Sequence, residues 1–249
     1  MKNFGLIGKS LAHSFSKDYF VNKFIAHNID SEYNNYELED VNSVRDLFIN
    51  DSTLYGLNVT IPYKEKVIKH LDSIDSLSEN IDSVNTIKRF SHNGKLHLKG
   101  YNTDVYGFNS LIAPYLKNHH KKALILGTGG ASKAVGFVLK NHKIEYDFIS
   151  RKESKDNLYN WSELDETMIG RYQIIINTTP VGMFPKYKEL IKLPYEKISD
   201  KNLLIDLIYN PRETLFLKEG RKRGAVVLGG YEMLIAQAEE SWKIWNNEL

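Results

Sequence analysis

Three glycines within four positions are the most distinctive chemical signal of this 249-residue chain. They lie in Gly127-Thr-Gly129-Gly130-Ala131-Ser132, directly after the apolar run Ala123–Leu126 and before a segment of helical character. Such glycines let the backbone approach phosphate groups, and the N-terminus of the following helix offers N–H groups and the positive end of its dipole. The spacing predicts a site for the pyrophosphate of a dinucleotide, although an ordinary strand-to-helix turn uses similar residues.

The end of the next predicted strand bears on which dinucleotide is bound. A carboxylate about twenty residues after the glycine turn commonly binds the ribose of NAD, whereas an arginine there accommodates the additional phosphate of NADP. Here Ser150, Arg151 and Lys152 end the strand, and the nearest preceding acid, Asp147, falls inside it. The pattern favours NADP over NAD. The alternative is that Arg151 and Lys152 form an ordinary solvated pair.

Four polar clusters occur near the start of the chain, each where a strand is expected to end or a helix to begin. They are His13–Ser16, Asn58–Lys64, Val84–Thr86 and Gly100–Asp104. Their hydroxyl, amide, ammonium and carboxylate groups suit a ligand with several hydroxyls. Each cluster is equally typical of a turn or a helix cap, and periodicity does not show that they converge.

The elements that position these residues alternate between β-type runs and helical stretches, which is typical of α/β folds with parallel sheets. In the first part we expect strands at 4–7, 33–38, 57–60 and 84–90 and helices at 17–27, 41–50 and 64–71, with Ser16 as N-cap of the first helix. From residue 104 we expect helices at 104–116, 133–141, 213–222 and 231–245 and strands at 121–126, 146–149, 172–176, 203–206 and 225–228.

Composition excludes several classes of protein. The 33 Lys and Arg nearly balance the 31 Asp and Glu, so no broad positive field attracts DNA or an anionic membrane. Zero cysteines exclude a thiolate zinc site, an iron–sulfur cluster and a cysteine nucleophile. Apolar runs are far shorter than the roughly 18 residues that span a bilayer. A soluble cytoplasmic protein of one or two domains, with a small-molecule ligand and no metal, is the expectation.

The chain resembles shikimate dehydrogenases along essentially its whole length. Eight stretches, in the family's order, carry the resemblance: HSFSKDYF at 13–20, GLNVTIPYKEKV at 56–67, VNTIKR at 84–89, GYNTDVYGF at 100–108, LGTGGASKA at 126–134, NTTPVGMFP at 177–185, DLIYNPRETLFL at 206–217 and GGYEMLIAQAEESWKIW at 229–245.

The resemblance implies NADP-dependent reduction of 3-dehydroshikimate to shikimate, a step of chorismate and aromatic amino acid biosynthesis. It also implies an open α/β substrate-binding domain, discontinuous at residues 1–102 and 232–249, and a Rossmann-like NADP-binding domain at 103–231. The active site of the family lies in the cleft between these domains. The oligomeric state is left open between a monomer and a homodimer.

Site roles follow from the resemblance residue by residue. It implies a catalytic pair, Lys64 and Asp104. Substrate contacts are implied for Ser14, Ser16, Thr60, Asn85, Tyr209 and Gln237. Cofactor contacts are implied for Gly127, Gly129, Gly130, Ala131, Ser150, Arg151, Gly230 and Met233. Hydride transfer places growing negative charge on the substrate carbonyl oxygen, which an ammonium within hydrogen-bond reach stabilises and protonates. Without the resemblance, the better interpretation of Lys64 is a solvated residue of the exposed PYKEK turn.

Departures from the family pattern bear on specificity. Lys17 stands where the family commonly has proline, and Ser150-Arg151-Lys152 with Lys155 replaces the usual Asn-Arg-Thr clamp. Ser14 and Ser16 are two residues apart, so in an extended segment both hydroxyls face one side. Related enzymes that also accept quinate tend to have threonine at one of these positions, so the resemblance implies that two serines favour shikimate over quinate. The alternatives are a quinate/shikimate dehydrogenase that uses NAD, and a non-catalytic nucleotide-binding protein, which the presence of both Lys64 and Asp104 disfavours.

Overall fold

The structure is a computed structural model and describes residues 1–11, 14–151 and 157–248. The chain divides into two compact units: unit 1 comprises residues 1–103 and 238–249, and unit 2 comprises residues 104–237. Unit 1 is therefore discontinuous in sequence, because unit 2 is inserted into it. Among the described residues, no helix is both long and apolar enough to cross a membrane.

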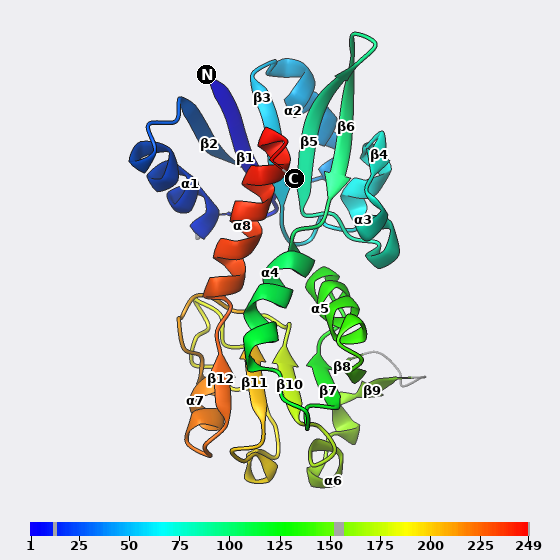
Figure 1. Cartoon of the computed structure of the whole chain (residues 1–249), viewed down its shortest axis with the longest axis vertical. Helices are drawn as coiled ribbons and strands as arrows, with labels where there is room; N and C mark the ends of the chain where they lie inside the picture. The colour runs from blue at the N-terminus through cyan, green and yellow to red at the C-terminus, as the bar shows by residue number, and fades with distance from the viewer. Residues whose placement is uncertain (12–13, 152–156, 249) are drawn as a thin grey trace. The chain divides into compact units, whose positions relative to one another are not determined.

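Unit 1 is built around one mixed sheet (Figure 1). Its strands are β1 (Lys2–Gly8), β2 (Ser31–Glu37), β3 (Leu54–Val59), β4 (Ser73–Ile74), β5 (Thr86–His92) and β6 (Lys95–Tyr101). Its helices are α1 (Phe15–Ala26), α2 (Val44–Asn50) and α3 (Ser76–Ile81), with 3-10 turns η1 (Val41–Ser43) and η2 (Lys66–His70). The strand order is β2-β1-β3-β5-β6-β4.

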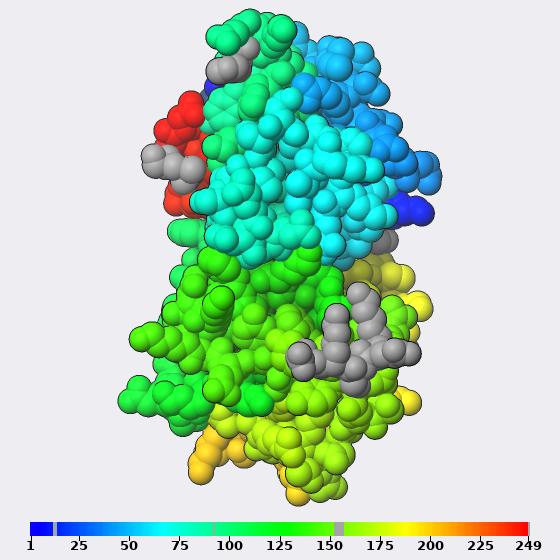
Figure 2. Space-filling model, turned by 90° about the vertical axis from the view of Figure 1, so that its right-hand side faces the viewer, coloured from blue at the N-terminus to red at the C-terminus, as the bar shows by residue number. Residues whose placement is uncertain are grey.

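Helix α8 (Tyr231–Asn246) closes one face of this sheet with its second half. Because side chains alternate along a strand, Phe4 and Leu6 of β1 point to one face and Ile7 to the other. The first face holds a cluster in which Phe4 packs with Phe20 and Phe24 of α1 and Trp245 of α8. The second face is covered by α2, η1 and η2. In Figure 2, η2 and α3 (cyan) form a continuous part of the molecular surface.

Two predictions for unit 1 are wrong. The helix expected at 64–71 is only the 3-10 turn η2. The sheet is not wholly parallel, because β5 pairs antiparallel with both β3 and β6. Strand β6 was not predicted, although Asn93-Gly94, with φ of 51° and 74°, forms the kind of two-residue turn that connects hairpin strands.

Unit 2 contains a sheet of six parallel strands. They are β7 (Lys122–Leu126), β8 (Glu145–Ser150), β9 (Leu158–Asn160), β10 (Ile174–Asn177), β11 (Leu203–Asp206) and β12 (Val226–Leu228). The helices are α4 (Asp104–Ile112), α5 (Gly130–Asn141), α6 (Glu166–Ile169) and α7 (Leu215–Arg221), with 3-10 turns η3 (Ala113–Tyr115), η4 (Trp161–Glu163) and η5 (Tyr195–Lys197). Listed from β9 to β12, the strands follow the order 3-2-1-4-5-6 of a doubly wound dinucleotide-binding fold.

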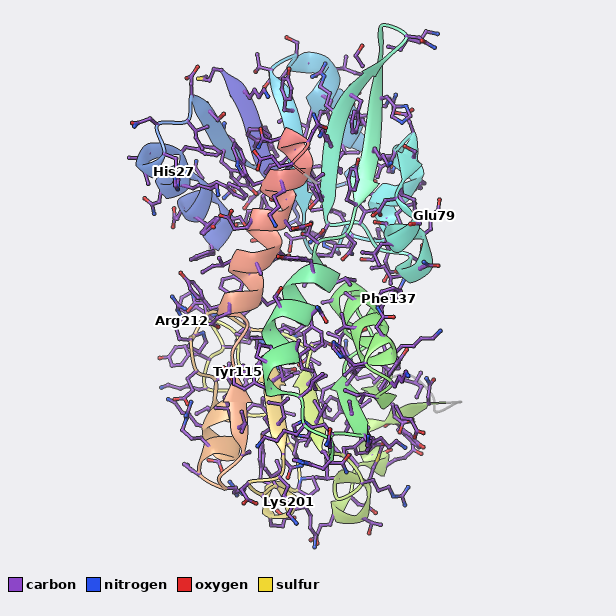
Figure 3. All side chains as sticks on the ribbon, in the orientation of Figure 1. His27, Glu79, Tyr115, Phe137, Lys201 and Arg212 are labelled. Atoms are coloured by element: carbon purple, nitrogen blue, oxygen red, sulfur yellow. The ribbon has the colours of Figure 1, made fainter. Side chains whose placement is uncertain are left out.

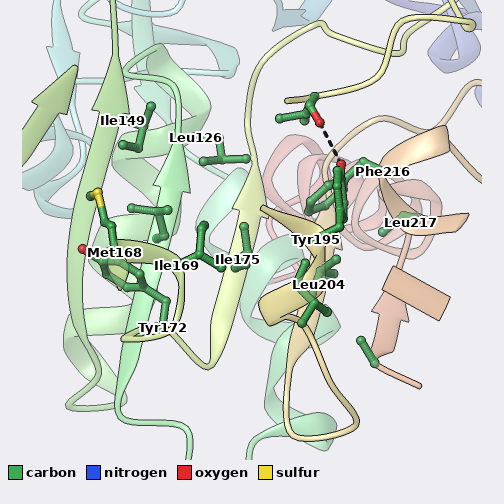
Figure 4. Close-up of a cluster of buried hydrophobic side chains, with 14 residues drawn as sticks. Leu126, Ile149, Met168, Ile169, Tyr172, Ile175, Tyr195, Leu204, Phe216 and Leu217 are labelled. Atoms are coloured by element: carbon green, nitrogen blue, oxygen red, sulfur yellow. Dashed lines mark hydrogen bonds between the residues drawn. The ribbon is translucent and has the colours of Figure 1, made fainter. Parts of the chain in front are cut away.

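Both faces of the unit 2 sheet are buried, as parallel sheets require. Figure 4 shows one face, where Leu126 and Ile175 pack with Met168 and Ile169 of α6 and with Phe216 of α7. Figure 1 shows α4 and α5 on the opposite face. The fully buried run Ile174–Asn177 explains why the sequence of β10 is continuously apolar rather than alternating. The predicted α/β class is confirmed.

Candidate active site

The glycine turn lies at the topological switch point of unit 2. Strand β7 sits between β8 on one side and β10 on the other, and the chain leaves β7 and β10 toward helices on opposite faces. Loops that follow two such strands diverge and leave a crevice at the carboxyl edge of the sheet, where doubly wound folds bind their ligands. The turn at Gly127 follows β7, and the turn at Thr178 follows β10.

Glycine is required at the first position of the turn. Gly127 has φ of 109°, and a Cβ there would lie 2.8 Å from Thr178 Oγ1. Gly129 is different, because its φ of −81° suits any residue and a Cβ there would meet no atom within 4 Å. Gly129 is the N-cap of the 12-residue helix α5. The open space beside it fits a phosphate group held by the helix N-terminus.

Ser132 fills the position where the dinucleotide pattern usually has a small residue. It is 1% exposed, and its hydroxyl donates to Gly129 O over 2.6 Å. This hydrogen bond fixes the first turn of α5 and leaves Gly130 and Ala131 at the start of the helix.

The end of β8 carries hydroxyl and guanidinium groups. Ser150 is its last residue and is buried, with its Oγ 3.4 Å from Thr128 Oγ1 of the glycine turn. Arg151 follows and is exposed. Asp147 accepts from Tyr172 over 2.7 Å and pairs with Lys122 over 2.8 Å, so its carboxylate is engaged inside unit 2. Lys152 and Lys155 lie outside the described residues, as does His13.

Tyr209 and Gly230 are brought together at the same edge of the sheet. Figure 3 shows Lys201 and Arg212 at opposite ends of β11, with Arg212 on the carboxyl side. The loop that contains Tyr209 packs on the segment before α8, because Gly230 N donates to Ile208 O over 3.1 Å. A Cβ at Gly230 would lie 2.2 Å from Leu207 O, so only glycine permits this approach.

Asp104, Met233 and Gln237 are placed by the contact of two helices in unit 2. Asp104 begins α4 and is 2% exposed. One turn later, Gly107 lets α8 approach, since a Cβ there would lie 2.7 Å from Met233 O and 3.2 Å from Gln237 Cβ. The structure therefore brings these predicted site residues onto two helices in direct contact.

Lys64 and Thr60 occupy an anchored loop after β3 in unit 1. Thr60 N donates to Ile7 O over 2.9 Å, and Lys64 O accepts from Val84 N over 2.8 Å. Between them, Tyr63 is 3% exposed and its hydroxyl donates to Leu38 O. The Lys64 side chain is half-buried. The loop is fixed by its neighbours on both sides, although it is not the helix that the sequence predicted.

The serines differ from the prediction in their local structure. Ser14, not Ser16, is the N-cap of α1, and its side chain makes no cap hydrogen bond. Ser16 lies in the first turn of the helix, so the argument from an extended segment is wrong for it. Lys17 is exposed in the same turn. Both hydroxyls are half-buried at the start of α1.

Asn85 is a buried member of the predicted substrate residues and is held by hydrogen bonds. It is 2% exposed, and its Oδ1 accepts from the backbone N–H of Thr103 over 2.7 Å. Its Nδ2 donates to Thr103 Oγ1 over 3.0 Å. Because a backbone N–H only donates, these contacts fix which end of the amide is oxygen.

The sequence analysis did not predict a role for one buried carboxylate of unit 2. Asp206, at the end of β11, accepts from Asn177 Nδ2, Ile208 N and Thr214 Oγ1 over 2.9, 3.0 and 2.6 Å. Burial raises the pKa of Asp206 to about 6, and these three hydrogen bonds oppose the rise. It ties the loops after β10 and β11 together. The only sequence signal was an acid at the end of an apolar strand.

The predicted residues fall into two groups. Unit 1 holds Ser14, Ser16, Thr60, Lys64 and Asn85, and unit 2 holds Asp104, Tyr209, Gln237 and all the predicted cofactor residues. The pairing of Lys64 with Asp104 spans the two units and stays a prediction. No cluster of three or more His, Asp or Glu side chains suited to a metal occurs within residues 1–11, 14–151 and 157–248.

Known proteins are similar to this chain in sequence and in structure. Residues 6–87 match the family model described as the shikimate dehydrogenase substrate binding domain. A shikimate dehydrogenase (NADP(+)) from Methanosphaera stadtmanae is 37% identical over 98% of this chain and 91% of its own length. The crystal structure of shikimate dehydrogenase 1 from Peptoclostridium difficile is 37% identical, with a TM-score of 0.82 over 99% of this chain and 92% of the other. A shikimate dehydrogenase crystallised with NADP+ is 31% identical, with a TM-score of 0.85 over 99% and 90%.

Proposed function

Because this chain belongs to the shikimate dehydrogenase family, we propose that it catalyses the reversible NADPH-dependent reduction of 3-dehydroshikimate to shikimate. It is thus an oxidoreductase that acts on a CH–OH group, in chorismate and aromatic amino acid biosynthesis. Among the structural features, the glycine turn at the switch point of a 3-2-1-4-5-6 sheet carries the proposal, because it supplies a phosphate site where such folds bind dinucleotides.

Unit 2 provides the groups that would hold NADP. The N-terminus of α5, with Gly127, Gly129, Gly130 and Ala131, binds the pyrophosphate. Ser150 and Arg151 bind the phosphate on the adenosine ribose, and the guanidinium offers that phosphate a charge-assisted hydrogen bond. Gly230 and Met233 would contact the nicotinamide. NADPH supplies the hydride when it is bound.

Unit 1 provides most of the substrate site. Ser14 and Ser16 donate to the substrate carboxylate, and Thr60 and Asn85 bind its hydroxyls. Gln237 and Tyr209 add polar contacts from unit 2. In this proposal the substrate-binding domain consists of residues 1–102 and 232–249, and the NADP-binding domain consists of residues 103–231.

Lys64 is the proposed proton donor. Its side-chain nitrogen is a hydrogen-bond donor that can deliver a proton to an oxygen within reach. Its ammonium stabilises the charge that grows on the C3 carbonyl oxygen during reduction and then protonates that oxygen. Asp104 orients the ammonium and accepts a hydrogen bond from the neighbouring substrate hydroxyl. In the reverse direction Lys64 takes the proton back from the alcohol.

An absorbance assay at the NADPH band tests the proposal. Shikimate with NADP+ should produce NADPH, and the same enzyme should turn over quinate, or use NAD+, at least about tenfold less efficiently in kcat/KM. Absence of turnover with shikimate and NADP+ would overturn the proposed reaction. Equal efficiency with quinate and NAD+ would overturn the proposed specificity and support a quinate/shikimate dehydrogenase instead.

We also propose that the enzyme acts in the cytoplasm on its small-molecule substrates as a monomer or homodimer. Fractionation of cells that express a tagged full-length chain tests the location, and sedimentation of the purified protein tests the assembly. Recovery in the membrane pellet, or a stable tetramer, would contradict this part of the proposal.

A further inference from the structure

A buried serine of the last helix lies at the centre of a hydrogen-bond network in unit 1. Ser241 is 0% exposed. Its Oγ lies 2.9 Å from Asn58 Nδ2, 2.8 Å from Thr86 Oγ1 and 3.3 Å from Thr103 Oγ1. These partners come from β3, from β5 and from the segment that follows β6. One hydroxyl therefore joins three parts of the chain that are far apart in sequence.

One branch of the network leads to Asn85. Thr86 Oγ1 donates to Asn85 Oδ1 over 3.2 Å. Since that bond uses the single proton of Thr86, Ser241 is the donor in its contact with Thr86. Thr103, the other partner of Ser241, both donates its N–H to Asn85 Oδ1 and accepts from Asn85 Nδ2. Ser241 is therefore connected to the Asn85 amide by two routes, one through Thr86 and one through Thr103. This amide is the group proposed to bind substrate hydroxyls.

The second branch leads to Tyr33. Asn58 Oδ1 accepts from the Tyr33 hydroxyl over 2.9 Å. Tyr33 is 1% exposed, and burial raises the pKa of this phenol far above its usual range, so it keeps its proton. A side-chain hydrogen bond between Ser16 and Tyr33 opposes that rise in pKa.

We propose that Ser241 is a positioning residue for the substrate: through Thr86 and Thr103 it orients Asn85. The last helix then serves the substrate site at two points, directly through Gln237 and indirectly through Ser241. This inference rests on the proposed function, because it assumes that Asn85 binds the substrate.

A second buried serine provides a matched control. Ser78 of α3 is also 0% exposed, but its Oγ has no hydrogen-bond partner among the described residues. Ser241→Ala and Ser78→Ala therefore remove the same atom from equally buried positions, and only the first disconnects the network. Thr86→Val gives a second route to the same branch, since valine has the shape of threonine without its hydroxyl and suits a strand.

The test is steady-state kinetics of the full chain with shikimate and NADP+ varied separately. For S241A and T86V, we expect the KM for shikimate to rise at least fivefold while the KM for NADP+ stays within twofold of the unmutated value. For S78A, both constants should stay within twofold. A merely structural role would move both KM values together, or neither. If S241A fails to fold, T86V decides the matter in the same way.

The kinetics distinguish a failure of the proposed function from a failure of the inference about Ser241. If the unmutated chain does not turn over shikimate, the proposed function fails. If the unmutated chain is active and the KM values of S241A and T86V match those of S78A, the inference about Ser241 fails while the proposed function stands. Because both variants interrupt one path, the S241A/T86V double variant should raise the KM for shikimate by clearly less than the product of the two single effects.

Discussion

The indole of Trp245 covers Gly56 so closely that a Cβ built on the glycine would lie 2.1 Å from Trp245 Nε1. The same indole donates to Ile87 O over 3.0 Å, which locks it against the sheet. Glycine at position 56 is therefore required for the last helix to dock on unit 1.

We expect Gly56→Ala to destabilise unit 1 by about 3 kcal/mol or more, because the methyl group either displaces the indole or forces the strands apart. Urea unfolding followed by tryptophan fluorescence measures this effect. Gly170→Ala is the control, since a Cβ at Gly170 would lie 3.4 Å from its nearest neighbour, in ordinary contact. Equal unfolding midpoints for the two variants would contradict the prediction.

Lys64→Ala should lower kcat at least about 100-fold, with a much smaller change in the KM for shikimate, because the ammonium acts on charge that develops only during the reaction. Lys66→Ala, which removes an exposed lysine two residues further along, is the matched control and should leave kcat within twofold. Near-normal kcat in the Lys64 variant would assign the proton transfer to another group.

Gly129→Ala should separate cofactor binding from stability. The new methyl group meets no protein atom, so unfolding should change by only about 0.5 kcal/mol, the typical scale of an N-cap effect. The methyl does project into the space proposed for the pyrophosphate, so the Kd for NADPH should rise at least tenfold. Quenching of intrinsic fluorescence on titration with NADPH measures the Kd. An unchanged Kd would show that the pyrophosphate does not bind at this turn.

Arg151→Ser tests the basis of the NADP preference. Loss of one charge-assisted hydrogen bond at an exposed site should raise the KM for NADP+ roughly tenfold and leave the KM for NAD+ nearly unchanged. Arg171→Ser removes another exposed arginine of unit 2 and is the control for a general charge effect. If both arginine variants shift the two constants alike, Arg151 is an ordinary surface residue.

Asp206 predicts a pH dependence of stability with a defined sign. Its pKa is about 6 in the folded protein and near 3.8 in the unfolded chain, so between these values the unfolded state loses its proton first. This carboxyl therefore makes the protein less stable as pH rises from 4 to 7.5, by roughly 2 kcal/mol relative to Asp206→Asn. Urea unfolding of both proteins across this range measures the difference. A constant difference, or one that grows in favour of Asp206, would contradict the assignment.

Local patterns in the sequence predicted most of unit 2. Its strands are buried on both faces and therefore appear as continuous apolar runs such as Ile174–Ile176, and the glycine turn marks the start of α5. Unit 1 was harder to predict because strand β6 has half-buried, polar-rich residues and no apolar run. Lys64–Leu71 has helical spacing, but Lys66–His70 forms only a 3-10 turn, and Lys64 O accepts from Val84 N of a distant segment.

The site was predictable from motifs only as a set of separate segments. Asn58 and Ser241 are hydrogen-bonded across 183 positions of sequence, and no local period or spacing reports such a contact. The same holds for Asp206 and Asn177, whose bond depends on the neighbouring register of β10 and β11. Residue types thus indicate which chemistry is available, whereas the pairing of distant strands and helices decides which groups meet.

The discontinuity of unit 1 has a consequence during synthesis. Residues 238–249 leave the ribosome only after all of unit 2 has been made, and they carry Ser241 and Trp245, which complete one face of the first sheet. Unit 2 can therefore fold before unit 1 is complete. Until the last helix has been made, it does not cover Phe4, Phe20 and Tyr33 of unit 1. For that interval the nascent chain exposes an aromatic surface of the kind that chaperones bind.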